Sequence, residues 1–174
     1  PTPFYVYSQS KITSTYESLK NTLDTEIFYA IKANSNQAII KLMASLGAGA
    51  DVVSVGELER AITAGVSSKK IIFEGIGKTK NDIAYAIEKN IRLINVESID
   101  ELERINKVAL HQNTKVDIGI RLNPNIDGKT IDKITTGKKT DKFGIDTDQL
   151  EETDGGAAAE EVDTELKDAA KDAI

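Results

Sequence analysis

The sequence predicts an α/β protein built as part of a (β/α)8 TIM barrel, with about five parallel βα units. Short apolar runs rich in β-branched and aromatic residues alternate with amphipathic stretches, and the runs begin every 20 to 24 residues. Strict alternation of these two patterns is typical of a parallel sheet. Because the spacing is regular and the connections are short, we expect a barrel rather than a doubly wound sheet.

Five apolar runs are the expected strands, at residues 27–30, 51–54, 71–73, 93–96 and 116–122. One helix is expected before the first strand and one between each pair of strands, because apolar residues there lie three or four positions apart. These helical positions are Ile12, Tyr16, Leu19 and Leu23, then Ile39, Leu42, Met43 and Leu46, then Leu58 and Ile62, then Ile83 and Ile87, and finally Ile99, Leu102, Ile105 and Val108.

The ends of the helices carry signals of their own. Gly47, Gly65 and Asn90 follow the last apolar position of three helices, as expected of C-terminal caps, which favour residues that accept a left-handed backbone. Ser98 precedes Glu101 by three residues, which is the spacing of a capping box at a helix start.

The charge is divided unevenly along the 174 residues, whose formal net charge is −6. Residues 1–147 carry 20 Lys and Arg against 18 Asp and Glu, whereas residues 148–174 carry 2 against 10. We therefore expect two parts: a partial barrel over 1–147 and an acidic, Ala- and Glu-rich tail over 148–174 that is helical or flexible. A narrow apolar stripe (Val162, Leu166, Ala169, Ala170 and Ala173) would let a helical tail pack on the open barrel or on a neighbouring chain, but a freely exposed tail helix is the alternative.

Composition excludes several classes of function. The chain has no Cys and one His, so a zinc–thiolate site, an iron–sulfur cluster, a disulfide framework and a Cys nucleophile are excluded and no metal site is expected. A net acidic chain is a poor nucleic-acid binder, and no apolar run approaches the ~20 residues of a membrane helix. We expect a cytoplasmic protein with neither nucleic acid nor membrane as partner.

Two glycine-rich stretches and the single histidine have plain explanations. GIGKT at 75–79 resembles the end of a phosphate-binding loop, but Ile72 stands where that motif needs a glycine. GAGADV at 47–52 has Val52 in the last glycine position of the dinucleotide fingerprint. We expect both to be turns, and we expect His111 to lie on the surface at the end of a helix.

Lys32 has the most chemically informative position. It lies at the carboxyl end of the first expected strand, in FYAIKANSN, and barrel enzymes hold their chemistry at this end of the strands. Apolar neighbours would favour the uncharged amine, which can form an imine with a carbonyl group. The alternative is an ordinary solvated lysine just past a strand.

A series of motifs occurs in order along the chain: TPFYVY at 2–7, FYAIKAN at 28–34, GAGADVVSVGELERAITAG at 47–65, IIFEGIGKT at 71–79, NVES at 95–98, RLNPNID at 121–127, TTG at 135–137 and DKFGID at 141–146. This series resembles a known family, the diaminopimelate decarboxylases, which are pyridoxal-phosphate enzymes of the alanine-racemase-like and ornithine-decarboxylase-like barrel group. The resemblance covers residues 1 to about 150.

The resemblance implies a site and a cofactor. Lys32 matches the catalytic lysine that holds pyridoxal 5'-phosphate through an imine, and Asp51 matches a carboxylate close to it. Ser54 and Glu57 belong to the same matched turn, and the resemblance implies that both bind the cofactor, although Glu57 would also suit the first turn of a helix. Arg121 matches an arginine of the cofactor network, with a structural salt bridge as the alternative, and Lys142 is a weaker candidate.

The resemblance also implies what lies outside the match. The family continues with a histidine that stacks on the cofactor, a glycine-rich phosphate loop, a Glu-Pro-Gly-Arg segment and a C-terminal β domain with a cysteine proton donor. None of these is found here, so we expect the chain alone to be an inactive decarboxylase fragment of lysine biosynthesis. A non-catalytic module that binds pyridoxal phosphate or a small phosphate, and a structural half barrel, stay open. The family is homodimeric and acts on a small amino acid, and open sheet edges could make this chain self-associate.

Overall fold

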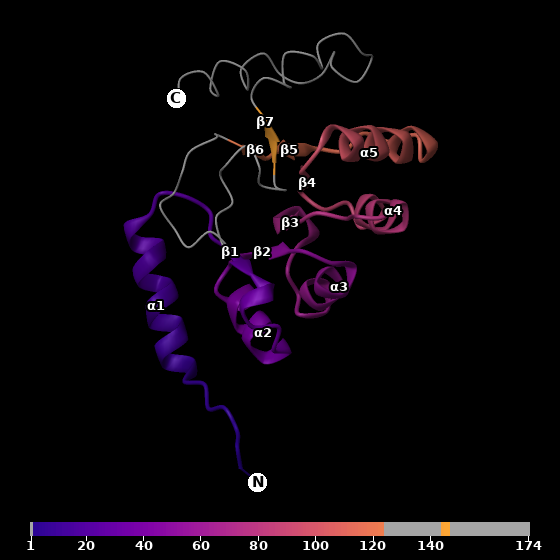
Figure 1. The fold of residues 1–174 in the computed structure, drawn as a ribbon. Coiled ribbons are helices and arrows are strands. Elements are labelled where there is room, and N and C mark those ends of the chain that lie inside the picture. Colours follow the sequence, from indigo (N-terminus) through magenta and orange to yellow (C-terminus); the bar gives the residue numbers. More distant parts are fainter. Residues whose placement is uncertain (1, 124–143, 147–174) are drawn as a thin grey trace.

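The computed structural model describes residues 2–123 and 144–146 as alternating helices and strands (Figure 1). The helices are α1 (Gln9–Thr22), α2 (Gln37–Ser45), α3 (Val55–Thr63), α4 (Lys80–Glu88) and α5 (Ile99–His111), with 3-10 turns at Ile31–Ala33 and Ser68–Lys70. The strands are β1 (Phe28–Ala30), β2 (Gly49–Val52), β3 (Ile71–Phe73), β4 (Leu93–Val96), β5 (Ile118–Ile120), β6 (Leu122–Asn123) and β7 (Ile145–Asp146).

Five strands form one parallel sheet in chain order, β1-β2-β3-β4-β5. Helices α2 to α5 follow their strands in the same order and cover one side of the curved sheet (Figure 1). Successive βα units that lie side by side in chain order are the arrangement of a (β/α)8 barrel, so the predicted fold class, a partial barrel, is confirmed.

The core lies between the sheet and the covering helices. Alternate strand residues point to this side, because side chains alternate between the two faces of a strand. Val52, Phe73, Ile94 and Val96 supply the strand half of the core, and each is at most 1% exposed. The helices add fully buried side chains from their inner faces, which are Ile40, Leu58, Ala61, Ile83, Ala86 and Ile105.

Helix ends follow the predicted capping chemistry. Gly47, Gly65 and Asn90 adopt positive φ angles of 94°, 91° and 52° just after α2, α3 and α4, and the three predicted C-terminal caps are confirmed. Ser98 caps α5 by accepting a hydrogen bond from the backbone N of Glu101. The carboxylate of Glu101, however, turns to the backbone N of Glu97 rather than to Ser98, so only half of the predicted capping box is present.

Three predicted strands differ in their bounds: the first begins at Phe28 rather than at residue 27, the second covers Gly49–Val52 rather than 51–54, and the fifth covers Ile118–Ile120 rather than 116–122. The second strand begins at Gly49 and ends at Val52, so the prediction that residues 47–52 form a turn is wrong beyond Ala48. The physical reason is tertiary: Gly49 pairs with Phe28 of β1, and a β-carbon on Gly49 would lie 2.5 Å from the Phe28 ring. The loop at 75–79 is a turn as predicted, with positive φ at Gly75 and Gly77.

The fifth predicted strand is interrupted at Arg121. The backbone N of Arg121 donates to the Val96 carbonyl on β4, whereas its own carbonyl accepts from the N of Ile145 on β7. The chain therefore changes its hydrogen-bonding partner at this residue, and β6 pairs in parallel with β7. The prediction that Arg121 lies within a strand is corrected: it lies between β5 and β6.

Helix α1 stands apart from the other helices (Figure 1), and only Tyr16 of its apolar residues is buried. Among the described residues, no helix combines the length and the apolar character needed to cross a membrane. The predicted boundary at 147/148, the tail and Lys142 lie outside the described residues.

Candidate functional site

Lys32 lies directly after β1, in the 3-10 turn Ile31–Ala33. The turn is fixed on both sides, because Ile31 is fully buried and the hydroxyl of Tyr29 donates to the carbonyl of Asn34 at 3.0 Å. Lys32 itself is exposed. The structure thus confirms its position at the carboxyl end of the first strand, but the apolar enclosure expected from its neighbours is wrong, since Ile31 points into the core instead.

Asp51 is the third residue of β2 and is half-buried. Its Oδ1 is buried and has no hydrogen-bond partner among the described residues. Burial raises the carboxyl pKa of Asp51 above its ordinary value of 3.8, and the nearby carboxylates of Glu74 and Glu57 raise it further, while the Lys32 ammonium opposes them. Lys32 and Asp51 therefore lie within electrostatic reach of each other.

Ser54 and Glu57 form the start of α3. The Ser54 hydroxyl accepts from the backbone N of Glu57 at 3.2 Å, and the Glu57 carboxylate accepts from the backbone N of Val53 at 2.9 Å. These contacts satisfy backbone groups that a helix start leaves unpaired. The contacts of Glu57 are those of a residue in the first turn of a helix, which was the alternative explanation. A cofactor role for Ser54 or Glu57 stays a prediction.

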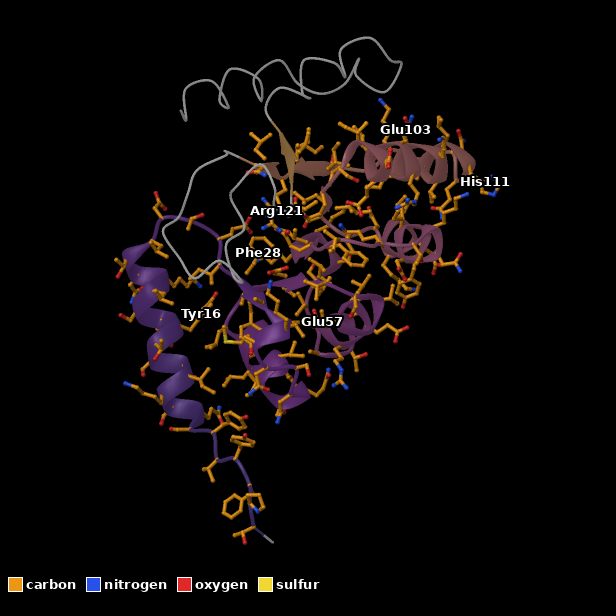
Figure 2. The ribbon with its side chains drawn as sticks, viewed as in Figure 1. Tyr16, Phe28, Glu57, Glu103, His111 and Arg121 are labelled. Atoms are coloured by element: carbon orange, nitrogen blue, oxygen red, sulfur yellow. The ribbon has the colours of Figure 1, made fainter. Side chains whose placement is uncertain are left out.

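Arg121 forms an ion pair with Glu97, which follows β4. Its Nη1 lies 3.2 Å and 3.3 Å from the two carboxylate oxygens. Glu97 is 4% exposed, whereas the Arg121 side chain is 37% exposed, so the guanidinium reaches from the open side of the sheet to a buried carboxylate. His111 lies at the far, exposed end of α5, as predicted, and Arg121 lies between β5 and β6, away from that end (Figure 2).

Sequence reasoning missed Glu74, Asn95 and Glu97. The side-chain amide of Asn95 donates to the carboxylate of Glu74, whose charge in turn acts on Asp51. A signal for two of them existed: Glu74 and Glu97 are the first polar residues after the apolar runs of β3 and β4, on the strand face opposite the core. If this alternation is applied to each apolar run, it places Glu74, Asn95 and Glu97 on the face opposite the core.

Together these side chains form a polar row along the carboxyl ends of the strands, on the face away from the helices. The row runs through Lys32, Asp51, Glu74, Asn95, Glu97 and Arg121. Lys32 offers an exposed primary amine, and Asp51 offers a carboxylate oxygen without a partner among the described residues. This combination suits a carbonyl compound that the amine can attack. The described residues hold no cluster of three His, Cys, Asp or Glu that could bind a metal ion.

Comparisons with known proteins agree with this geometry. Residues 9–164 match the family described as "Pyridoxal-dependent decarboxylase, pyridoxal binding domain". The chain is 46% identical over 148 residues to the diaminopimelate decarboxylase of Helicobacter pylori and 45% identical over 147 residues to that of Neisseria meningitidis. Each alignment covers 83% of this chain and 36% of the relative, so the chain spans about a third of the length of these relatives.

The fold is shared with solved structures of the same enzymes. The crystal structure of diaminopimelate decarboxylase from Helicobacter pylori complexed with L-lysine superimposes with a TM-score of 0.84 at 43% identity, covering 87% of this chain and 39% of that one. The enzyme from M. jannaschii in co-complex with L-lysine gives a TM-score of 0.77 at 42% identity, covering 93% and 39%. With most of its length matched, this chain belongs to the pyridoxal-dependent decarboxylases and carries part of their pyridoxal-binding domain.

Proposed function

We propose that this chain supplies the lysine-bearing part of the pyridoxal-phosphate site of a diaminopimelate decarboxylase, which converts meso-2,6-diaminopimelate to L-lysine and carbon dioxide. One observation carries the proposal: an exposed lysine, Lys32, lies within electrostatic reach of Asp51, whose buried Oδ1 has no partner in the described part of the chain, at the strand ends where barrel enzymes hold their chemistry. The identity of 42 to 46% to diaminopimelate decarboxylases supports the choice of substrate over other amino acids.

The residues present fit the cofactor. Lys32 offers the amine, Asp51 a carboxylate oxygen without a partner among the described residues, and Arg121 a partly exposed guanidinium on the same side of the sheet. When bound, pyridoxal phosphate would supply a ring that accepts the electron pair left behind as carbon dioxide departs.

The chain's own residues would have distinct tasks at this site. Lys32 would hold the cofactor through its Nζ, because an exposed primary amine can bond covalently to the cofactor's aldehyde group. The Asp51 carboxylate would stabilise positive charge on that nitrogen and hold its proton, because an opposite charge nearby favours the charged form. Arg121, fixed by Glu97, would present its guanidinium to an anionic group of the cofactor or the substrate.

Borohydride trapping tests the proposal directly. The chain is mixed with pyridoxal phosphate and then reduced, which turns a carbon–nitrogen double bond between a lysine and the aldehyde into a stable amine. The product is digested, and the labelled lysines are mapped by mass spectrometry. We expect the label to concentrate on Lys32 and to disappear in Lys32→Arg. The matched control is Lys41→Arg in α2, an exposed lysine away from the row, which should label like the unsubstituted chain. Equal labelling of many lysines would contradict the proposal.

Activity is proposed for the assembled enzyme. Because the chain spans 36% of the length of its relatives, we expect no lysine formation from diaminopimelate by the chain alone, and turnover once a separately expressed remainder of a related enzyme is added. Lys32 labelling without turnover after that addition would favour the alternative, a fragment that only binds the cofactor. A homodimer and a cytoplasmic location are part of the same proposal.

A further inference from the structure

Lys78 is a lysine buried behind the candidate site. Its side chain is 2% exposed and lies between the loop that follows β3 and the start of α5. The Nζ donates to the carbonyl oxygens of Gly75 and Asn95, the latter at 2.7 Å, and lies 3.3 Å from Oε2 of Glu101. The sequence analysis predicted only a turn at residues 75–79, and the partner Glu101 lies 23 residues further along the chain.

Glu101 completes a clamp on the end of β4. Its carboxylate accepts from Lys78 and also from the backbone N of Glu97 at 2.9 Å. Lys78 therefore holds the backbone at Asn95, and Glu101 holds it two residues further on, at Glu97. The segment between these two contacts is fixed to the β3–α4 loop and to α5 at once.

The clamped segment carries side chains of the candidate site. The amide of Asn95 donates to Glu74, and the carboxylate of Glu97 pairs with Arg121. A shift of the carboxyl end of β4 would displace both contacts. It would therefore move Glu74, the acidic neighbour of Asp51, and the guanidinium of Arg121.

The lysine is not required simply to start a helix. Helix α3 begins with the same arrangement, a serine cap and a glutamate, Glu57, that accepts from the backbone N of Val53. Within residues 2–123 and 144–146, no lysine or arginine forms an ion pair with Glu57. Moreover, a buried ion pair contributes little net stability compared with apolar residues of the same volume, since desolvation offsets the attraction.

We propose that Lys78 is a positioning residue of the pyridoxal-phosphate site: it holds the carboxyl end of β4 so that Asn95 and Glu97 face Lys32 and Asp51. This inference rests on the proposed function. It assigns Lys78 no contact with cofactor or substrate.

The test separates positioning from stability with two variants, Lys78→Met and Lys78→Met/Glu101→Gln. The single variant leaves a buried carboxylate uncompensated, so we expect its urea midpoint to fall and Lys32 to need more pyridoxal phosphate for half-maximal borohydride labelling. The double variant removes the stranded charge while Gln still accepts from the N of Glu97. We expect its urea midpoint to recover but its half-saturating cofactor concentration to stay about tenfold raised, which corresponds to about 1.4 kcal/mol.

The matched control is Lys70→Met at the opposite end of β3, where Nζ donates to the carbonyl of Gly47. It should leave Lys32 labelling unchanged. If the double variant regains both stability and labelling, the positioning role is wrong while the proposed function stands. If the unsubstituted chain does not label at Lys32, the proposed function fails. NMR then tests whether Lys78 holds the end of β4, because the side-chain amide resonances of Asn95 should shift in the double variant. Unchanged Asn95 resonances would overturn the positioning role.

Discussion

The side chain of Asn95 occupies the space that a β-carbon on Gly119 would take: that carbon would lie 2.0 Å from Asn95 Oδ1. The two residues are paired across β4 and β5, so their substituents point to the same face of the sheet. The glycine leaves room for the amide that donates to Glu74. A polar contact of the candidate site on one strand thus depends on a missing side chain on the next.

Replacing Gly119 with alanine should therefore damage the site through Asn95. The new methyl group would force the Asn95 amide to move and to release Glu74. We expect the free energy of unfolding in urea to fall by about 1 to 3 kcal/mol, the usual cost of overpacking, and Lys32 labelling to weaken.

A second glycine provides the control. A β-carbon on Gly56, in the first turn of α3, would have its nearest neighbour at an ordinary 3.9 Å, the hydroxyl of Ser54. Gly56→Ala should be neutral or stabilising by up to about 1 kcal/mol, because alanine favours a helix more than glycine does. Equal losses in the two variants would contradict the packing argument at Gly119.

The order of strands and the helix ends could be predicted from the sequence because both depend on local patterns. Apolar runs define β3 and β4 to the residue, and Gly65 or Asn90 ends a helix through its own backbone preference. The start of β2 could not be predicted, since Gly49 joins the strand by pairing with Phe28, 21 residues earlier in the chain, whose ring leaves no room for a β-carbon there.

The candidate site was predictable only in part. Lys32 and Asp51 follow strand signals and were found through motifs, but the interaction of Asp51 with Glu74 depends on which strands are neighbours. The burial of Lys78 depends on Glu101, 23 residues further along the chain, so no local pattern contains it. Long-range pairing of charges is the information that a single sequence does not display.

Ser54→Ala tests whether Ser54 does more than cap α3. The hydroxyl accepts from the backbone N of Glu57, so its loss should lower the free energy of unfolding by about 1 kcal/mol. We expect Lys32 labelling at saturating pyridoxal phosphate to be unchanged. The control is Ser98→Ala, which removes the equivalent cap of α5. A selective loss of labelling in Ser54→Ala alone would show that the hydroxyl takes part in the cofactor site.

Asp51→Asn should raise the stability of the protein in a pH-dependent way and weaken Lys32 labelling. The carboxyl pKa of Asp51 is raised by burial and by Glu74, so the folded protein holds this proton more tightly than the unfolded chain does. Stability is then lost as pH rises from the ordinary value of 3.8 through the raised value. At pH 7 the asparagine variant should be more stable than the unsubstituted chain, by a margin that shrinks as pH falls towards 3.8, while Lys32 labelling weakens.

The comparison for that prediction is Asp82→Asn. Asp82 is a partly exposed residue in the first turn of α4 whose carboxylate accepts from the backbone N of Thr79 at 2.8 Å. Here the charge is favourable, so the same substitution should lower stability at pH 7 by about 0.5 kcal/mol. Urea unfolding at several pH values measures both variants, and a loss of stability in Asp51→Asn at pH 7 would contradict the burial argument.

The pair Glu97–Arg121 should show a coupling that an exposed pair lacks. Arg121→Met leaves the Glu97 carboxylate, 4% exposed, without its guanidinium, and we expect the free energy of unfolding to fall by about 2 kcal/mol at pH 7. Glu97→Gln/Arg121→Met should recover most of this loss, because no charge is then stranded. A double-mutant cycle in urea gives the interaction energy, expected at about 1 to 3 kcal/mol.

The control is the ion pair between Glu103 and Lys107, four residues apart on α5, with both side chains more than 60% exposed. The same cycle on this pair should give about 0.3 to 0.5 kcal/mol. Equal coupling in the two cycles would mean that the burial of Glu97 adds nothing, and that Arg121 is held at the site by some contact other than this carboxylate.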